Sequence, residues 1–185
     1  MVLLAIMKNS SRAWLKQISF YFGGDQPPVS WHERLRAGIG AFIGLMLVLT
    51  IAKYFGELNG VDEWLMASLA ASALLVFVLP QSPMAQPWAV IAGNTLSAIA
   101  GISISYLFTQ PLVAMPAAAM LSIWGMFILR CLHPPAAAVA LIAVLSQTMG
   151  FRYAFFPVFI DSVLLVLAGT VYSNLTGKSY PNRPN

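Results

Sequence analysis

One short stretch of this sequence brings together a permanent cation, an ionisable ring and a helix start. Arg130 precedes His133 by three residues, and two prolines and three alanines follow. Proline is disfavoured in a helix interior but suits the first turn, so we expect a helix that begins at the end of the proline pair. Free N–H groups at such a helix start, next to an arginine, favour a bound anion. The candidate anion-binding residues of this stretch are Arg130, His133, Pro134, Pro135, Ala136, Ala137 and Ala138.

The side chains of Arg130 and His133 each allow two interpretations. The planar, always charged guanidinium of Arg130 matches a small oxyanion, but an arginine at a helix end also serves as an anchor on the cytoplasmic side. His133 is suited to donate to an anion, or to change protonation with pH and so couple transport to protons. Its ring could instead cap the loop by bonding a backbone carbonyl. We leave both roles of Arg130 open and favour the functional role for His133.

Asp161 is the one acid inside an apolar run. A carboxylate within a membrane is costly and normally finds a partner in the interior of the bundle. Arg130, His133 and Lys53 are the candidate partners. Asp161 is therefore either half of a structural ion pair or a proton-carrying group beside the route of an anion.

Two amide side chains, Gln86 and Asn94, are candidates for the opposite wall of an anion site. Each could instead bond backbone groups that the prolines of residues 80–87 leave free. Small residues also recur every fourth position in this region, which predicts either a helix-packing face or a pore lining, with packing preferred. This small-residue stripe consists of Ala89, Gly93, Ser97, Gly101 and Ser105.

The composition places these residues in a membrane protein. Of the 185 residues, 59% are hydrophobic and 9% are charged, whereas about a quarter of a soluble domain is charged. Backbone groups in lipid must pair within their own segment, so long apolar runs without strand alternation predict helices. The fold class is all-α, a polytopic membrane helix bundle of about six apolar segments with four to six spans. These segments are residues 35–55, 64–79, 88–108, 112–129, 135–147 and 154–172.

The order of the segments suggests a further organisation. The second and fifth segments are short and are each bordered by prolines, which suggests a 3+3 inverted repeat with two proline-interrupted short segments. Most of the ten lysines and arginines fall on one side of a six-span arrangement, which predicts cytoplasmic termini in a bacterial inner membrane. We expect an amphipathic or flexible segment over residues 1–33, the transmembrane domain over residues 34–175 and a cytoplasmic tail over residues 176–185.

The sequence gives little support for other function classes. Two histidines and one cysteine do not supply a metal site, and neither a G-x-S-x-G motif nor a glycine-rich phosphate loop is present. We therefore expect no enzymatic activity, no metal and no cofactor, and the net charge of +4 does not indicate nucleic-acid binding. The expected partners are the lipid bilayer and a small inorganic anion. The small-residue faces also allow a homo-oligomer.

The stretch from Arg130 to Ala137 resembles the signature of the HPP family of integral membrane proteins, named for its His-Pro-Pro tripeptide. Residues 80–87 followed by Gly93 and Asn94 resemble the second marked stretch of that family, and the likeness covers roughly residues 34–175. The family is described with four membrane helices, and some plastid and cyanobacterial members are associated with nitrite transport. The resemblance implies a transporter or channel for a small inorganic anion, with nitrite the first candidate. The alternative is a non-conducting membrane scaffold or sensor that recruits a partner.

Overall fold

The computed structural model describes residues 29–54, 62–145 and 150–182, with the side chains of residues 52 and 62–67 left out. The chain divides into a short N-terminal unit, residues 1–31, and a second unit, residues 32–185, which contains everything discussed below. Most of the predicted N-terminal amphipathic segment therefore lies outside the described residues.

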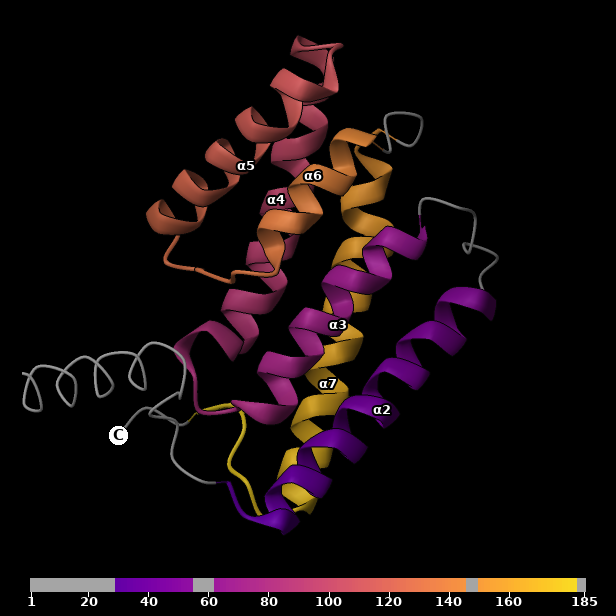
Figure 1. Cartoon of the computed structure of the whole chain (residues 1–185), viewed down its shortest axis with the longest axis vertical. Coiled ribbons are helices and arrows are strands. Elements are labelled where there is room, and N and C mark those ends of the chain that lie inside the picture. Colours follow the sequence, from indigo (N-terminus) through magenta and orange to yellow (C-terminus); the bar gives the residue numbers. More distant parts are fainter. Residues whose placement is uncertain (1–28, 55–61, 146–149, 183–185) are drawn as a thin grey trace, which may run out of the picture. The chain divides into compact units, whose positions relative to one another are not determined.

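The described residues form helices and connections only, which confirms the all-α fold class (Figure 1). Proline stands at the first position of α4 and of α5, where its missing N–H costs nothing. A helix also begins directly after the proline pair of the signature stretch, as predicted. The elements are α2 (Trp31–Tyr54), α3 (Asp62–Val78), η1 (Pro83–Ala85), α4 (Pro87–Leu107), α5 (Pro111–Ile128), α6 (Ala136–Leu145), η3 (Ala154–Phe159), which is kinked at Phe156, and α7 (Ile160–Leu175).

Four of these helical segments are long and apolar enough to cross a membrane, namely α2, α4, α5 and the segment formed by η3 and α7, which is kinked at Phe156. The apolar helices Ser68–Val78 in α3 and Ala136–Leu145 in α6 are shorter, in agreement with the two short segments expected from the sequence. Successive helices alternate in direction (Figure 1). The second group of three helices therefore runs opposite to the first group, as an inverted repeat requires.

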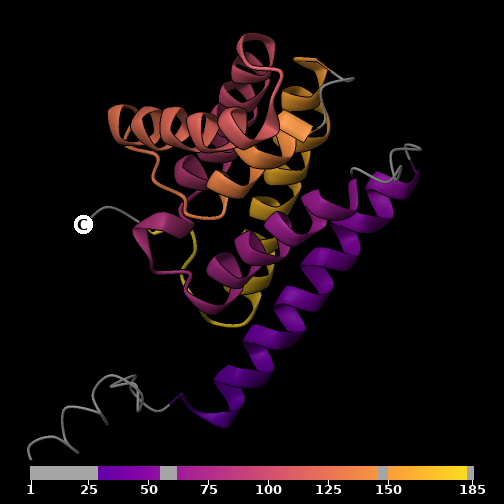
Figure 2. The ribbon, with the colours of Figure 1, turned by 45° about the horizontal axis from the view of Figure 1, so that its top comes forward.

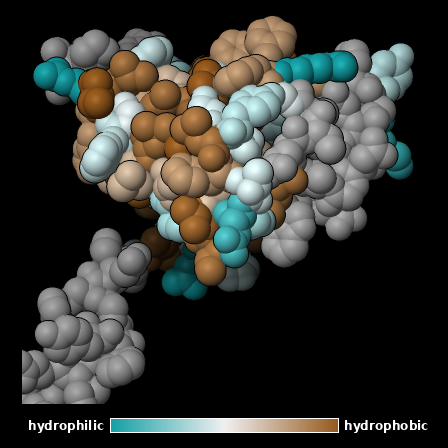
Figure 3. All heavy atoms as spheres, turned by 90° about the horizontal axis from the view of Figure 1, so that it is seen from above, coloured by the Kyte–Doolittle hydropathy of each residue, from teal (hydrophilic) through white to brown (hydrophobic). Residues whose placement is uncertain are grey.

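The outer surface of the described unit is apolar over wide areas (Figure 3). Leu112 and Ile128, at opposite ends of α5, are each 79% exposed, and Phe127 next to Ile128 is 61% exposed. Apolar surface on this scale is unfavourable in water but is the normal boundary of a protein in lipid. The exposed side chains therefore face the hydrocarbon of the bilayer.

The small-residue stripe of α4 is a packing face. A Cβ atom at Gly101 would overlap the carbonyl oxygen of Ala140 on α6, so the glycine lets the two backbones approach closely. Farther along the same stripe, Ser97 shares a buried hydrogen bond with Ser122 of α5. Helix α4 lies beside both α5 and α6 (Figures 1 and 2). The packing interpretation of the stripe is therefore confirmed.

The glycines of α2 also serve contacts within the chain. A Cβ atom at Gly40 would lie 2.5 Å from the ring of Tyr172 on α7, and one at Gly44 would lie 2.5 Å from the ring of Phe77 on α3. These two rings form an edge-to-face pair with centroids 5.8 Å apart. The small faces are thus used inside one protomer, so they no longer indicate an oligomer.

Residues 176–182, which belong to the expected cytoplasmic tail, pack against the bundle. The side chain of Tyr180 is 1% exposed and belongs to the main apolar core. Its hydroxyl donates to the carbonyl oxygen of Ala85 at 2.7 Å. One tyrosine thus anchors this part of the tail to the bundle.

Candidate functional site

The imidazole of His133 is fully buried and bonds two other elements. Its Nδ1 lies 2.8 Å from the carbonyl oxygen of Met84 in η1, and its Nε2 lies 2.8 Å from the hydroxyl of Ser72 on α3. Because a carbonyl can only accept, Nδ1 carries the proton, and Nε2 of the neutral ring accepts from the hydroxyl. His133 thus joins the connection between α5 and α6 to α3 and to η1.

The burial of the His133 side chain also favours the uncharged ring. The residue lies in a connection outside the membrane-spanning helices, and burial lowers its pKa from 6.5 to about 4, although the bond to Met84 opposes the change. A ring held neutral in this way does not change its charge near pH 7. The geometry therefore supports the capping role that the sequence left as an alternative, and it does not support proton coupling through His133.

The N–H groups at the start of α6 are not free. Ala136 donates to the carbonyl oxygen of His133 at 2.9 Å, Ala137 to that of Pro134 at 3.2 Å and Ala138 to that of Pro135 at 3.1 Å. The prolines form a tight turn whose carbonyls take up the donors of the first helical turn. The predicted cradle of free N–H groups is therefore wrong for this conformation.

Arg130 has a different environment from His133. It is exposed, and its backbone adopts the left-handed conformation with φ at 52°, where α5 ends and the chain turns. Its guanidinium makes no hydrogen bond or ion pair with any residue that the structure describes. The sequence spacing thus brought the two residues into one turn, but one side chain faces outward and the other faces the core.

Asn94 and Gln86, the two amides that the sequence suggested for the wall of an anion site, make different contacts. Asn94 on α4 is 1% exposed, and its Nδ2 donates to the hydroxyl of Ser162 on α7 at 3.0 Å. Its Oδ1 is buried and has no hydrogen-bond partner among the described residues. Gln86 instead bonds the carbonyls of Pro80 and Ser82 at 3.0 and 2.9 Å, as expected of an amide beside prolines.

Asp161 lies in the first turn of α7 and is 2% exposed. A carboxylate is favourable at this end of a helix, where the N–H dipoles point toward it. The predicted pairing with His133 is wrong, because both ring nitrogens of that residue bond elsewhere. The other two candidate partners, Arg130 and Lys53, are exposed, whereas Asp161 is buried.

The sequence reasoning missed Ser72 and Ser68. Ser72 bonds the histidine, and the hydroxyl of Ser68 donates to the carbonyl oxygen of Pro135 at 2.9 Å. The two serines stand four residues apart in the apolar part of α3, residues 64–78, so they share one face. That spacing was the available signal for a polar contact with another element.

These contacts form two buried polar pairs, Ser72 with His133 and Asn94 with Ser162, here together called the buried polar cluster. Helix α4 also packs closely against His133, because a Cβ atom at Gly93 would lie 2.9 Å from Cβ of His133. The cluster joins α3, α4, α7 and the connection before α6. Polar groups buried inside a membrane domain are costly, so such a cluster is a candidate functional site.

Comparison with known proteins identifies the family of the chain. The family described as "HPP, transmembrane region" matches residues 26–181. The chain belongs to the HPP transmembrane family. This HPP protein is therefore an integral membrane protein, in agreement with its four long apolar helices.

Two transmembrane proteins of Dictyostelium discoideum are similar to the HPP protein. One is 34% identical over 193 residues, which cover 95% of this chain and 62% of the relative. The other is 35% identical over 165 residues, which cover 84% of this chain and 58% of the relative. The chain thus spans less than two thirds of either relative. No solved structure matches it.

Proposed function

We propose that this HPP protein is a transporter or channel for a small inorganic anion, rather than an enzyme, with nitrite as the first substrate to test. The buried polar cluster is the observation that carries the proposal. The amide nitrogen of Asn94 has two N–H donors and bonds only the Ser162 hydroxyl among the described residues, although apolar residues would pack this interface at lower cost. The second N–H can donate to an anion. Such a group is useful where a polar solute passes. Nitrite is chosen by family resemblance alone.

Arg130 is the proposed first contact of the anion. Its exposed guanidinium is close in sequence to the connection that carries His133 and would raise the local concentration of anions. The donors at the start of α6 are occupied, so the conformation described here is a closed one. Passage requires the connection over residues 129–135 to move, which fits alternating access. The buried carboxylate of Asp161 is the proposed proton carrier.

We also propose that the start of α2 and the end of α7 face the cytoplasm of a bacterial cell. The ion pair between Nζ of Lys178 and Glu33, at 3.2 Å, joins these two ends of the chain. Arg34 and Arg36 lie at the same end of α2. A concentration of cations at one end is typical of the cytoplasmic side.

The test is the flux of nitrite into proteoliposomes that contain the purified protein. The Arg130→Ala variant should lose most of the flux, whereas Arg152→Ala, which removes another exposed arginine, should retain it. Equal flux in Arg130→Ala and the unaltered protein would remove Arg130 from the mechanism. Nitrate, formate and chloride extend the same assay to other small anions.

The non-conducting scaffold or sensor is the second candidate. One observation favours it: the His133 side chain and the first N–H groups of α6 all have hydrogen-bond partners in this conformation. A purely structural connection would be built in the same way. Absence of flux with all four anions, together with a protein that copurifies, would support this candidate.

A further inference from the structure

The chain reverses direction after α7. Gly177 has φ at 77°, which glycine adopts at little cost, and the N–H of Lys178 donates to the carbonyl oxygen of Ser173 at 2.8 Å. The side chain of Asn174 then bonds the carbonyl oxygen of Tyr180 at 2.7 Å. Residues 176–182, here called the C-terminal strap, therefore lie back against the bundle (Figure 1).

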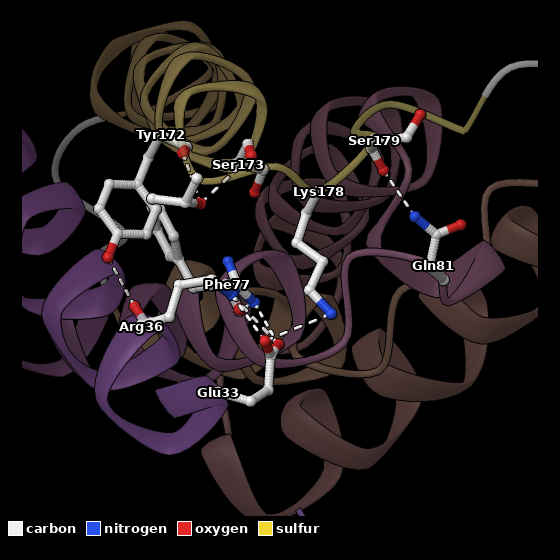
Figure 4. Close-up of polar contacts among 9 residues, drawn as sticks. Glu33, Arg36, Phe77, Gln81, Tyr172, Ser173, Lys178 and Ser179 are labelled. Atoms are coloured by element: carbon white, nitrogen blue, oxygen red, sulfur yellow. Dashed lines mark hydrogen bonds and ion pairs between the residues drawn. The ribbon is translucent and has the colours of Figure 1, made fainter. Parts of the chain in front are cut away.

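The C-terminal strap bonds the connection between α3 and α4 at several points. The buried hydroxyl of Tyr180 holds the carbonyl of Ala85, as described above. Gln81 donates to the carbonyl oxygen of Ser179 at 2.6 Å (Figure 4). The backbone and side chain of Asn182 donate to Gln86 Oε1 at 2.8 Å and to the carbonyl oxygen of Gln81 at 2.9 Å.

The same connection holds the histidine of the signature. The carbonyl of Met84 accepts from His133, and the next carbonyl along the chain, that of Ala85, accepts from Tyr180. Both carbonyls belong to the single turn η1, so they cannot move independently. A displacement of Tyr180 therefore loosens the turn that fixes His133.

One end of the C-terminal strap is suited to release. Lys178 pairs with Glu33, which also bonds Arg36 at 2.7 Å (Figure 4). The side chain of Lys178 is 42% exposed, so its ion pair contributes little to stability and weakens with salt. The strap thus combines a buried anchor with a weak, solvent-exposed contact.

We propose that the C-terminal strap is a latch for the signature connection, residues 129–135. While Tyr180 is seated, η1 holds His133 and the connection stays closed. When the strap lifts, the bond from His133 to Met84 weakens and the connection opens more often. The idea that the latch regulates anion passage rests on the proposed function. The mechanical coupling between the C-terminal strap and the signature connection does not depend on it.

Cys131 provides a reporter that needs no transport. It is the one cysteine of the sequence, stands two residues before His133 and is 0% exposed. A water-soluble maleimide reacts with such a thiol only during local opening, so the labelling rate follows the opening equilibrium. Labelling of the full chain in proteoliposomes therefore measures how often the connection opens.

The first variant is Tyr180→Phe, which removes the hydroxyl and keeps the ring. Loss of one net hydrogen bond corresponds to about a fivefold faster labelling of Cys131. Gln81→Ala, which removes a bond from the exposed side of the strap, should also speed labelling. The matched control is Tyr106→Phe, because Tyr106 is 66% exposed on α4 and lies outside the strap.

The result that overturns the latch is an unchanged labelling rate in both Tyr180→Phe and Gln81→Ala, or an equal increase in Tyr106→Phe. Thermal unfolding of each variant separates local opening from general loss of structure. If the unfolding temperature of Tyr180→Phe falls strongly, the labelling rate of Gln81→Ala alone decides the test. Faster labelling without flux of nitrite, nitrate, formate or chloride in any of these proteins would support the latch and contradict anion transport.

Discussion

The hydrogen bond between Ser72 and His133 gives the sharpest prediction about the buried polar cluster. The Ser72→Ala variant removes the hydroxyl that lies 2.8 Å from Nε2. The change is small in volume, so the packing of α3 against its neighbours stays nearly the same. Nε2 of His133 is then left in the core without its donor, because both residues are 0% exposed.

The expected cost follows from this loss. A buried polar atom deprived of its partner costs about 1–3 kcal/mol, compared with about 0.5–1.5 kcal/mol for an average hydrogen bond. In a chain of this length about 1 kcal/mol lowers the unfolding temperature by about 2–4 °C. We therefore expect a fall of several degrees for Ser72→Ala.

The assay is thermal unfolding of the purified protein in detergent. The matched control is Ser103→Ala, because the hydroxyl of Ser103 bonds only the Ile99 carbonyl of its own helix. That variant should change the stability by about 0.5 kcal/mol or less. An unfolding temperature of Ser72→Ala equal to that of Ser103→Ala would refute the role assigned to the bond with His133.

Three further predictions test other parts of the structure. Gly101→Ala should destabilise the protein by about 1–3 kcal/mol in the same unfolding assay, because its Cβ overlaps Ala140. The control Gly38→Ala, whose Cβ has nothing within 4 Å, should not destabilise the protein, because alanine is favoured over glycine inside a helix. The pKa of His133 is about 4 in the folded protein, whereas its ordinary value is 6.5. As the pH falls, the unfolded chain therefore takes up a proton at this residue before the folded protein does. Stability measured between pH 7 and pH 4 should therefore fall across that window, and His133→Gln should lose this component. Asp161→Asn should make nitrite flux independent of pH, and an unchanged pH profile would exclude Asp161 as the proton carrier.

The fold class could be predicted from the sequence because it depends on quantities that sum along the chain. The low charge, the lengths of the apolar runs and the prolines at the starts of α4 and α5 define helices and membrane location. The small-residue stripe likewise predicted a packing face, because only close approach requires Gly101. These signals are local and need no knowledge of neighbouring elements.

The sequence singled out His133 as a candidate site residue, but it did not predict the contacts of this residue. His133 is buried and bonds two other elements. Its two partners, Ser72 and Met84, come from other elements, and one of them is a backbone carbonyl that carries no sequence signal. The donors at the start of α6 were expected to be free because the tight proline turn that uses them was not foreseen. The anchoring role of Tyr180 was not predicted either, because its partner is the backbone carbonyl of Ala85, which carries no sequence signal.

The measurement that tests the central claim most directly is nitrite flux in proteoliposomes with a change at Asn94. We predict that the unaltered protein conducts well above empty liposomes and that Asn94→Ala lowers the flux about tenfold or more, equivalent to about 1.4 kcal/mol in the barrier. The adjacent Thr95→Val variant, which removes a hydroxyl bonded to Ile91 of the same helix, should keep most of the flux. Flux no higher than that of empty liposomes, or equal loss in both variants, would contradict passage of an anion through the buried polar cluster.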